Sequence, residues 1–211
     1  MGMFQWIVKG GITMYVLIPC SVLSVAVTIE RILYYYRRSR VERDAFMTDI
    51  KSQMNRNSHN LKQAMSLCTG MCRDAGTPFA NVVCAGLDAY GRGEKEMTSN
   101  MERAIMIETN ALSRFTTIVG TIASVAVYIG LFGTVLGIMK AFHNISATGT
   151  GGISVVINGV SEALITTIAG LCIAVPAVIA YNYFARRIDN FITDMELCAS
   201  EILDILLEKQ K

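Results

Sequence analysis

The stretch ISVVINGVSEALITTIAGLCIAVPAVIAYNY, residues 153–183, contains a single charged residue, Glu162. An α-helix needs about 20 apolar residues to cross a hydrocarbon core of about 30 Å, and this stretch is long enough to do so. Two further stretches, residues 10–29 and 115–139, contain no charged residue at all. The sequence therefore predicts an all-α integral membrane protein with three transmembrane helices.

The composition agrees with a lipid environment. Of the 211 residues, 52% are hydrophobic and only 17% are charged, and the mean hydropathy is +0.41. Soluble domains carry about 25% charged residues. The formal net charge of +2 gives no indication of a nucleic-acid partner, so the lipid bilayer is the expected surrounding and no nucleic acid is expected.

Positive residues collect on one side of the predicted spans, and cytoplasmic loops carry an excess of Lys and Arg. The arginines that flank the spans are Arg31, Arg37, Arg38, Arg40, Arg43, Arg103, Arg114, Arg186 and Arg187. This distribution predicts a periplasmic N-terminus, a cytoplasmic segment 37–114, an external loop 140–152 and a cytoplasmic C-terminus. Lys9 and Lys140 are exceptions to it.

The predicted organisation has four parts. Residues 1–36 form the periplasmic N-terminus and first transmembrane helix, and residues 37–114 form a helical cytoplasmic segment. Residues 115–184 form the second and third transmembrane helices with the short loop 140–152, and residues 185–211 form a cytoplasmic C-terminal helix. Both cytoplasmic parts are expected to be long helical extensions, because no strand-like alternation is present.

Within the cytoplasmic segment, helix breaks are expected at residues 69–70, 76–78 and 91–93, where glycine and proline occur. Ser99 followed by Glu102 has the spacing of a capping box, which predicts a helix start that continues without interruption into the second span. In the C-terminal helix, apolar residues recur at spacings of four and three, namely Phe191, Met195, Cys198, Ile202 and Ile205. This pattern predicts an amphipathic helix that packs against a partner surface.

Small residues follow one face of each later span, at about 100° per residue. In the second span this stripe contains Thr116, Gly120, Ala123, Val127, Gly130, Thr134, Gly137 and Ala141. In the third span it contains Gly159, Ala163, Thr166, Gly170, Ala174 and Ala177. The opposite face of the third span is bulky, with Ile157, Leu164, Ile168, Leu171, Val175 and Ile179. Small residues let helices approach closely in lipid, so both stripes are predicted to be packing seams.

Glu162 is the candidate functional residue, because an ionisable group within a membrane span is costly unless it is neutralised, paired or hydrated. Two structural interpretations remain open: solvation near the external interface, or a hydrogen bond between helices. Thr134 and Thr167 are further candidates, although threonine in a membrane helix often bonds its own backbone. Thr166 and Asn158 are secondary polar candidates on the same side of the third span.

No metal or cofactor is predicted. Cys68, Cys72 and His59 lack the second Cys/His pair that a zinc module needs, and the sequence contains no glycine-rich phosphate loop.

Several motifs in the later spans resemble those of ExbB and TolQ, in the MotA/TolQ/ExbB proton channel family. They are LFGTVLGIM at 131–139, SEALITT at 161–167, AVPA at 174–177 and YN at 181–182. The end of the first span, TIER at 28–31, is also similar to that family. Roughly half of the chain carries the resemblance.

The resemblance implies a subunit, not an enzyme, of a motor in the inner membrane of Gram-negative bacteria, driven by the proton motive force. It implies a ring of copies, usually a pentamer, around a dimer of a single-span ExbD/TolR-like partner, whose intramembrane aspartate carries the proton. Residues matching Glu162, Thr134 and Thr167 line the route. The ring energises a TonB/TolA-like periplasm-spanning protein. ExbB-like support of outer-membrane transport is expected, with TolQ-like envelope maintenance as the alternative.

Three other classes compete with this interpretation. A self-sufficient channel or carrier is disfavoured by three spans without an inverted repeat. A purely structural scaffold would tolerate replacement of Glu162. A flagellar stator subunit of the same superfamily would have four spans rather than three.

Overall fold

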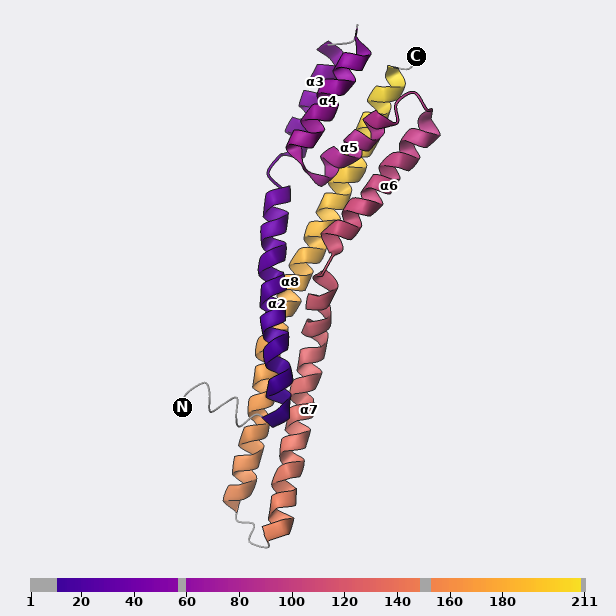
Figure 1. Ribbon diagram of the computed structural model, residues 1–211. Coiled ribbons are helices and arrows are strands. Elements are labelled where there is room, and N and C mark those ends of the chain that lie inside the picture. Colours follow the sequence, from indigo (N-terminus) through magenta and orange to yellow (C-terminus); the bar gives the residue numbers. More distant parts are fainter. Residues whose placement is uncertain (1–10, 57–59, 149–152, 210–211) are drawn as a thin grey trace. The chain divides into compact units, whose positions relative to one another are not determined.

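The computed structural model describes residues 11–56, 60–148 and 153–209, and all regular elements in these ranges are α-helices. The helices are α2 (Gly11–Arg38), α3 (Arg43–Arg56), α4 (Leu61–Ala75), α5 (Pro78–Asp88), α6 (Glu94–Ser113), α7 (Thr116–Thr148) and α8 (Ile153–Glu208) (Figure 1). The chain divides into two compact units. The first, here called the apolar unit, comprises Met1–Arg31 and Phe115–Phe184, and the second, the bundle unit, comprises Ile32–Arg114 and Ala185–Lys211.

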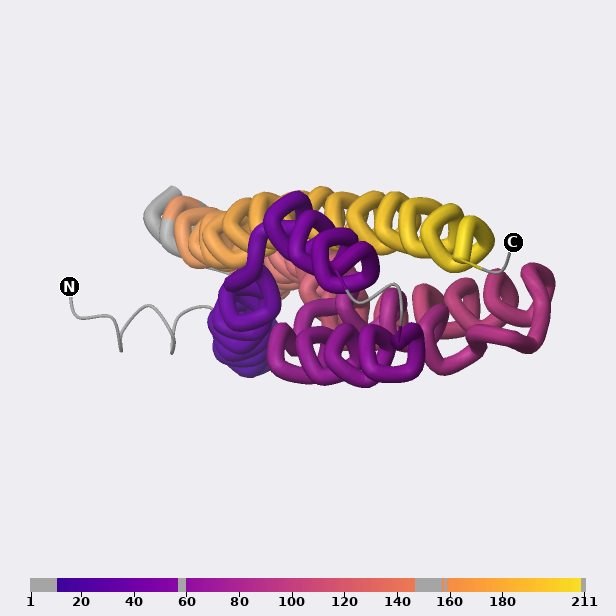
Figure 2. Tube along the Cα trace, turned by 90° about the horizontal axis from the view of Figure 1, so that it is seen from above, coloured from indigo at the N-terminus to yellow at the C-terminus, as the bar shows by residue number. Residues whose placement is uncertain are grey.

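Among the described residues, three helices, α2, α7 and α8, contain segments long and apolar enough to cross a membrane, which confirms the all-helical class with three apolar helices. In the apolar unit these three helices lie side by side (Figure 1). Met14 and Leu17 of α2 form a buried cluster with Ala126 of α7 and Ala174 of α8. Figure 2 follows the coil of α8 through its orange and yellow residues without a break.

Helices α7 and α8 are antiparallel and pack through glycine and alanine, as the small face of α8 predicted. A Cβ atom added to Gly137 would lie 2.6 Å from the Ala163 Cβ atom, and one added to Gly170 would lie 2.6 Å from the Ala126 carbonyl oxygen. Ala163, Thr166, Gly170, Ala174 and Ala177 are all buried. Backbones this close gain dispersion contacts that do not depend on water, which is what helix association in lipid requires.

The predicted stripe on α7 needs one correction. Val127 is exposed and Thr134 only half-buried, whereas Ala126 and Gly133 are buried against the neighbouring helices. Spacings of three and four fit more than one stripe on a helix of 3.6 residues per turn, so the periodicity alone did not select the residues in contact.

The bulky face of α8 is exposed, as predicted. Its members, Ile157, Leu164, Ile168, Leu171, Val175 and Ile179, have exposed fractions between 43% and 65%. Contiguous apolar surface of this kind marks a lipid-facing or protein-facing surface.

The bundle unit packs α3 to α6 with the end of α2 and the C-terminal part of α8. Phe191, Met195, Cys198 and Ile202 of α8 are buried, which confirms the predicted amphipathic helix. Leu206 rather than Ile205 completes the buried stripe. The Tyr35 hydroxyl donates a hydrogen bond to the Leu112 carbonyl oxygen at 2.9 Å, so this buried phenol has a partner.

Two of the three expected breaks in this unit are confirmed. Helix α4 ends before Gly76, which has a φ of 57°, and α5 starts with Pro78 after the Thr77 cap. Residues 91–93 separate α5 from α6. The break expected at residues 69–70 is wrong, because α4 continues through Gly70. One glycine lowers helix stability by about 1 kcal/mol, which the buried face of α4 offsets.

The junction of α6 and α7 also corrects the sequence prediction. Helix α6 starts at Glu94, five residues before Ser99, and ends at Ser113. Arg114 is extended, with a ψ of 132°, and Phe115 has a φ of 66°, so α6 does not continue into α7. A positive φ is unfavourable for a bulky residue. The Arg31 guanidinium lies 5.4 Å from the centre of the Phe115 ring, a cation–π contact that stabilises this conformation.

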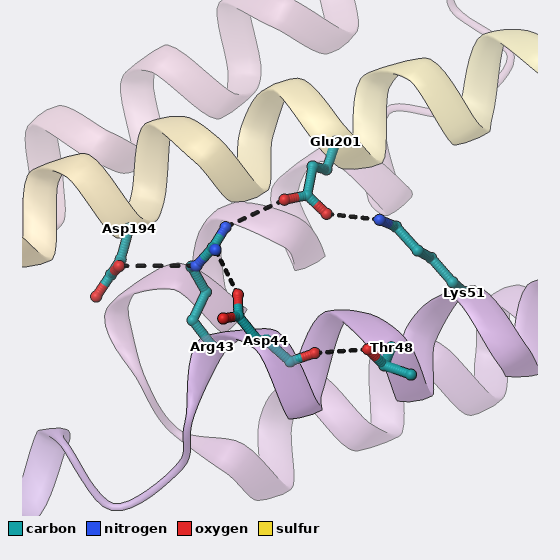
Figure 3. Close-up of polar contacts among 6 residues, drawn as sticks. All are labelled: Arg43, Asp44, Thr48, Lys51, Asp194 and Glu201. Atoms are coloured by element: carbon teal, nitrogen blue, oxygen red, sulfur yellow. Dashed lines mark hydrogen bonds and ion pairs between the residues drawn. The ribbon is translucent and has the colours of Figure 1, made fainter.

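An ion-pair network connects α3 to α8 in the bundle unit (Figure 3). Arg43 Nη1 lies 3.1 Å from Glu201 Oε1, and Lys51 Nζ lies 2.7 Å from Glu201 Oε2. Arg43 also pairs with Asp44 of its own helix and, at 3.8 Å, with Asp194 of α8. The hydrogen bond from Lys51 and the nearby Arg43 lower the pKa of Glu201, whereas burial raises the pKa of Asp194.

We expect Glu201→Gln to destabilise the protein at neutral pH by about 0.2–1 kcal/mol, the range of solvent-exposed ion pairs. Because the folded pKa of Glu201 is lowered, its contribution is present above the unfolded value, about 4.3, and is lost as the pH falls through the folded value. Denaturation of the full chain in detergent at neutral and acidic pH measures this difference. Glu196→Gln, at an exposed site on the same helix, is the matched control. Equal losses at both pH values would contradict the prediction.

Candidate functional site

A recess of about 430 Å³ opens on the apolar unit, lined by residues of α2, α7 and α8. Its polar lining consists of Thr13, Lys140, Asn144, Glu162 and Thr166. Glycine and alanine form much of the remaining wall, because the same small residues that bring α7 and α8 together leave space beside the seam. The recess is large enough for several water molecules, each of which occupies about 30 Å³ in the liquid.

Glu162 is half-buried on α8 and lines this recess. Its neighbour Ala163 contacts α7 at Gly137, so the backbone that carries the carboxylate is held tightly against α7. Within the described residues, no basic group lies within 4.0 Å of the carboxylate. Because Glu162 lines the recess, water can reach its carboxylate, and this hydration lowers the free-energy cost of placing an acid in an apolar unit.

The hydroxyl groups of Thr134, Thr166 and Thr167 donate hydrogen bonds to backbone carbonyl oxygens. Thr166 lies within hydrogen-bond distance of the Ala163 carbonyl oxygen, at 2.7 Å, and of the Gly130 carbonyl oxygen, at 3.2 Å. Thr167 donates to the Gly130 carbonyl oxygen at 3.1 Å, and Thr134 donates to the Leu131 carbonyl oxygen of its own helix at 2.6 Å. The hydroxyl oxygens can still accept hydrogen bonds from water.

Of the sequence-predicted residues, the structure brings Glu162 and Thr166 together at the recess. Thr134 and Thr167 are not part of its lining, and Thr167 instead connects α8 to α7. The side chain of Asn158 lies outside the described residues. The roles of these residues in an ion path stay predictions.

Three polar members of the recess were not predicted from the sequence: Thr13, Lys140 and Asn144. In the sequence, Lys140 is recognisable only as an exception to the charge distribution. The position of Lys140 near Glu162 depends on the register between α7 and α8, and the position of Thr13 depends on how α2 packs. Neither position has a signal in the sequence.

No group of three or more His, Cys, Asp or Glu side chains that could hold a metal is present within the described ranges, and His59 lies outside them. Cys68, Cys72 and Cys198 are buried in the bundle unit. Burial raises the pKa of both Cys72 and Cys198 to about 12. Thiolate is the form that binds metals and reacts, so these protonated thiols act as core side chains.

Three candidate membrane spans and an acid beside a hydratable recess define a multi-pass membrane protein with features of an ion-conducting subunit. Residues 74–197 match the model of the MotA/TolQ/ExbB proton channel family. The chain belongs to this family, as the motifs in its two later spans predicted.

Relatives of two kinds are similar to the chain. The biopolymer transport protein ExbB of Pseudomonas putida is 39% identical over 112 residues, which cover 53% of this chain and 34% of the relative. ExbB of Salmonella typhimurium is 38% identical over 112 residues and is covered over 46% of its length. The chain thus spans less than half of these two relatives. The Tol-Pal system protein TolQ of Haemophilus influenzae is 30% identical over 205 residues, which cover 90% of this chain and 86% of the relative.

Proposed function

We propose that this chain is the ring-forming stator subunit of an inner-membrane motor driven by the proton motive force. The observation that carries the proposal is Glu162, a half-buried acid that lines a recess among three apolar helices. The N-terminus and the segment 140–152 are periplasmic, and the segment 37–114 and the C-terminus are cytoplasmic, in line with the arginine distribution. Residues 140–148 of this segment were expected to be a loop but form the end of α7.

The assembly is a ring of copies, expected to be a pentamer, around a dimer of a single-span ExbD/TolR-like protein. The exposed aliphatic face of α8 is available for contact with a neighbouring chain or with lipid. The motor acts on a TonB/TolA-like protein that spans the periplasm. Membership of the MotA/TolQ/ExbB family and the similarity to ExbB and TolQ proteins support these partners.

Glu162, Thr134 and Thr167 line the ion path, with Thr166 and Asn158 as secondary members. Protons from the periplasm reach the interface between ring and dimer, neutralise an acid transiently and allow the dimer to rotate or shift before release to the cytoplasm. Each charge that crosses 100 mV supplies about 2.3 kcal/mol, so several protons in one step can perform mechanical work.

ExbB-like energising of active transport across the outer membrane is the first assignment, and TolQ-like envelope maintenance is the second. The second is supported by the TolQ relative, whose similarity extends over 90% of this chain. A strain that lacks the gene separates the two. Loss of growth on an iron–siderophore complex would indicate the ExbB-like function, and sensitivity to detergent would indicate the TolQ-like function.

Reconstitution tests the motor itself. The chain is placed in proteoliposomes with and without its single-span ExbD/TolR-like partner, and proton uptake is measured under an imposed membrane potential. We expect uptake only when both proteins are present. Strong flux through this chain alone would overturn the proposal in favour of a self-sufficient channel, and lack of flux through an intact complex would favour a scaffold.

A further inference from the structure

The register between α7 and α8 places Lys140 near Glu162. Gly137 packs against Ala163, and Gly159 packs against Ala141, so the two helices run past each other in opposite directions at this level. Lys140 directly precedes Ala141, and Glu162 directly precedes Ala163. Both charged residues therefore lie within one helical turn of the same contact, on facing helices.

Both residues border the same recess. Lys140 and Glu162 each line it, together with the polar Asn144 and Thr13. Lys140 is exposed, and neither charge is part of an ion pair within 4.0 Å among the residues that the structure describes. A lysine ammonium on its flexible four-carbon stem can move within such a space.

We propose that Lys140 is the charge partner of Glu162 and makes the recess selective for protons over metal cations such as Na⁺. This inference rests on the proposed function, since it specifies which ion the same site accepts. It assigns a role to the lysine that is an exception to the positive-inside distribution.

The selectivity follows from how each ion is held. A metal cation is held at a carboxylate by electrostatic attraction and needs several oxygen ligands, and a nearby ammonium repels it while competing for the same oxygens. A proton forms a covalent O–H bond with the carboxylate and needs no further ligands. The ammonium therefore weakens proton uptake but does not prevent it, whereas it removes the attraction on which a metal cation depends.

Among the residues that the structure describes, few other titratable groups of this chain line the recess with Glu162. On α7 the described lining contains Lys140 and the neutral Asn144, and on α2 it contains Thr13. On α8 itself, Thr166 is the other polar member. His143 of α7 is exposed and is not part of the lining. Loss of the Lys140 charge therefore acts mainly on one carboxylate.

The test uses the complex of the full chain with its single-span partner in proteoliposomes. Proton uptake is measured with a pH-sensitive dye across a series of pH values, in sodium chloride and in choline chloride of equal ionic strength. The variants are Lys140→Met and Lys140→Arg, with Lys95→Met at an exposed site on α6 as the matched control. Co-purification of the partner verifies that each variant assembles.

We expect Lys140→Met to move the pH midpoint of uptake upward by about one unit, the effect of losing a nearby opposite charge. Sodium should lower its flux several-fold relative to choline. The wild-type chain, Lys140→Arg and Lys95→Met should keep the original midpoint and show no difference between the two salts.

An unchanged midpoint together with equal flux in both salts for an assembled Lys140→Met complex would overturn the inference and leave the proposed function intact. Sodium inhibition of the wild-type complex would overturn it without any variant, even if Lys140→Met fails to assemble. The proposed function fails in a different way, when the wild-type complex takes up no protons or when Glu162→Gln conducts as well as the wild type.

Discussion

Replacing Glu162 with glutamine is expected to reduce proton-driven activity to the background level while leaving the chain folded and its complex assembled. Glutamine has nearly the same size as glutamate, so the packing of α8 at Ala163 against α7 is kept. It cannot take up or release a proton. Lys140, the proposed charge partner of Glu162, is exposed, so loss of the carboxylate leaves no buried cation without a partner.

The measurement combines growth on an iron–siderophore complex, detergent sensitivity and co-purification of the single-span partner. Glu102→Gln is the matched control, because Glu102 is exposed on α6 and the same atoms change. We expect this control to behave as the wild type in all three assays. Normal growth and normal detergent resistance of Glu162→Gln, with the partner still bound, would show that Glu162 is structural and would remove the central element of the proposed path.

Side-chain size predicted most of the apolar unit. Small residues recur on one face of residues 153–183 and bulky aliphatic residues on the other, and the structure buries the first face and exposes the second. A helix has only one rotation that satisfies both patterns. The buried and exposed faces of this span could therefore be predicted from side-chain size, because lipid surrounds every turn of a membrane helix in the same way.

The bundle unit and the junction of α6 and α7 were harder to predict, because tertiary contacts decide them. Ser99 and Glu102 form a capping pattern in the middle of α6, where packing of Met97 and Met101 keeps the chain helical. No glycine or proline next to Phe115 indicates a helix break in the sequence. The positive φ of Phe115 depends on surrounding contacts such as the one with Arg31. Such tertiary contacts override the intrinsic helix propensities of the individual residues.

The acidic residue of the candidate site could be predicted from the sequence, but the residues that surround it could not. A single acid among apolar residues identified Glu162 without any structure. The recess depends on which residues of α2 and α7 face that acid, and this requires the register between helices. Lys140 shows the difference most clearly, because its sequence neighbours indicate only a span boundary while the register of the seam places it near Glu162.

Gly170→Ala is expected to destabilise the apolar unit by about 1–3 kcal/mol, as overpacking of a well-packed site does. The added Cβ would lie 2.6 Å from the Ala126 carbonyl oxygen and 3.1 Å from the Gly130 Cα atom, so α7 and α8 must separate. Their separation would also lengthen the hydrogen bond from Thr167 to the Gly130 carbonyl oxygen.

Gly70→Ala is the matched control for this prediction and should have the opposite sign. Gly70 lies inside α4, and a Cβ added there meets no atom within 4 Å, so alanine should stabilise the helix by about 0.5–1 kcal/mol. Denaturation of the two full-length variants in detergent, followed by circular dichroism, measures both changes. If Gly170→Ala is as stable as Gly70→Ala, the close contact between α7 and α8 does not hold. The recess that contains Glu162 would then lack its supporting wall, because the same seam positions Gly137, Ala163 and the carboxylate beside them.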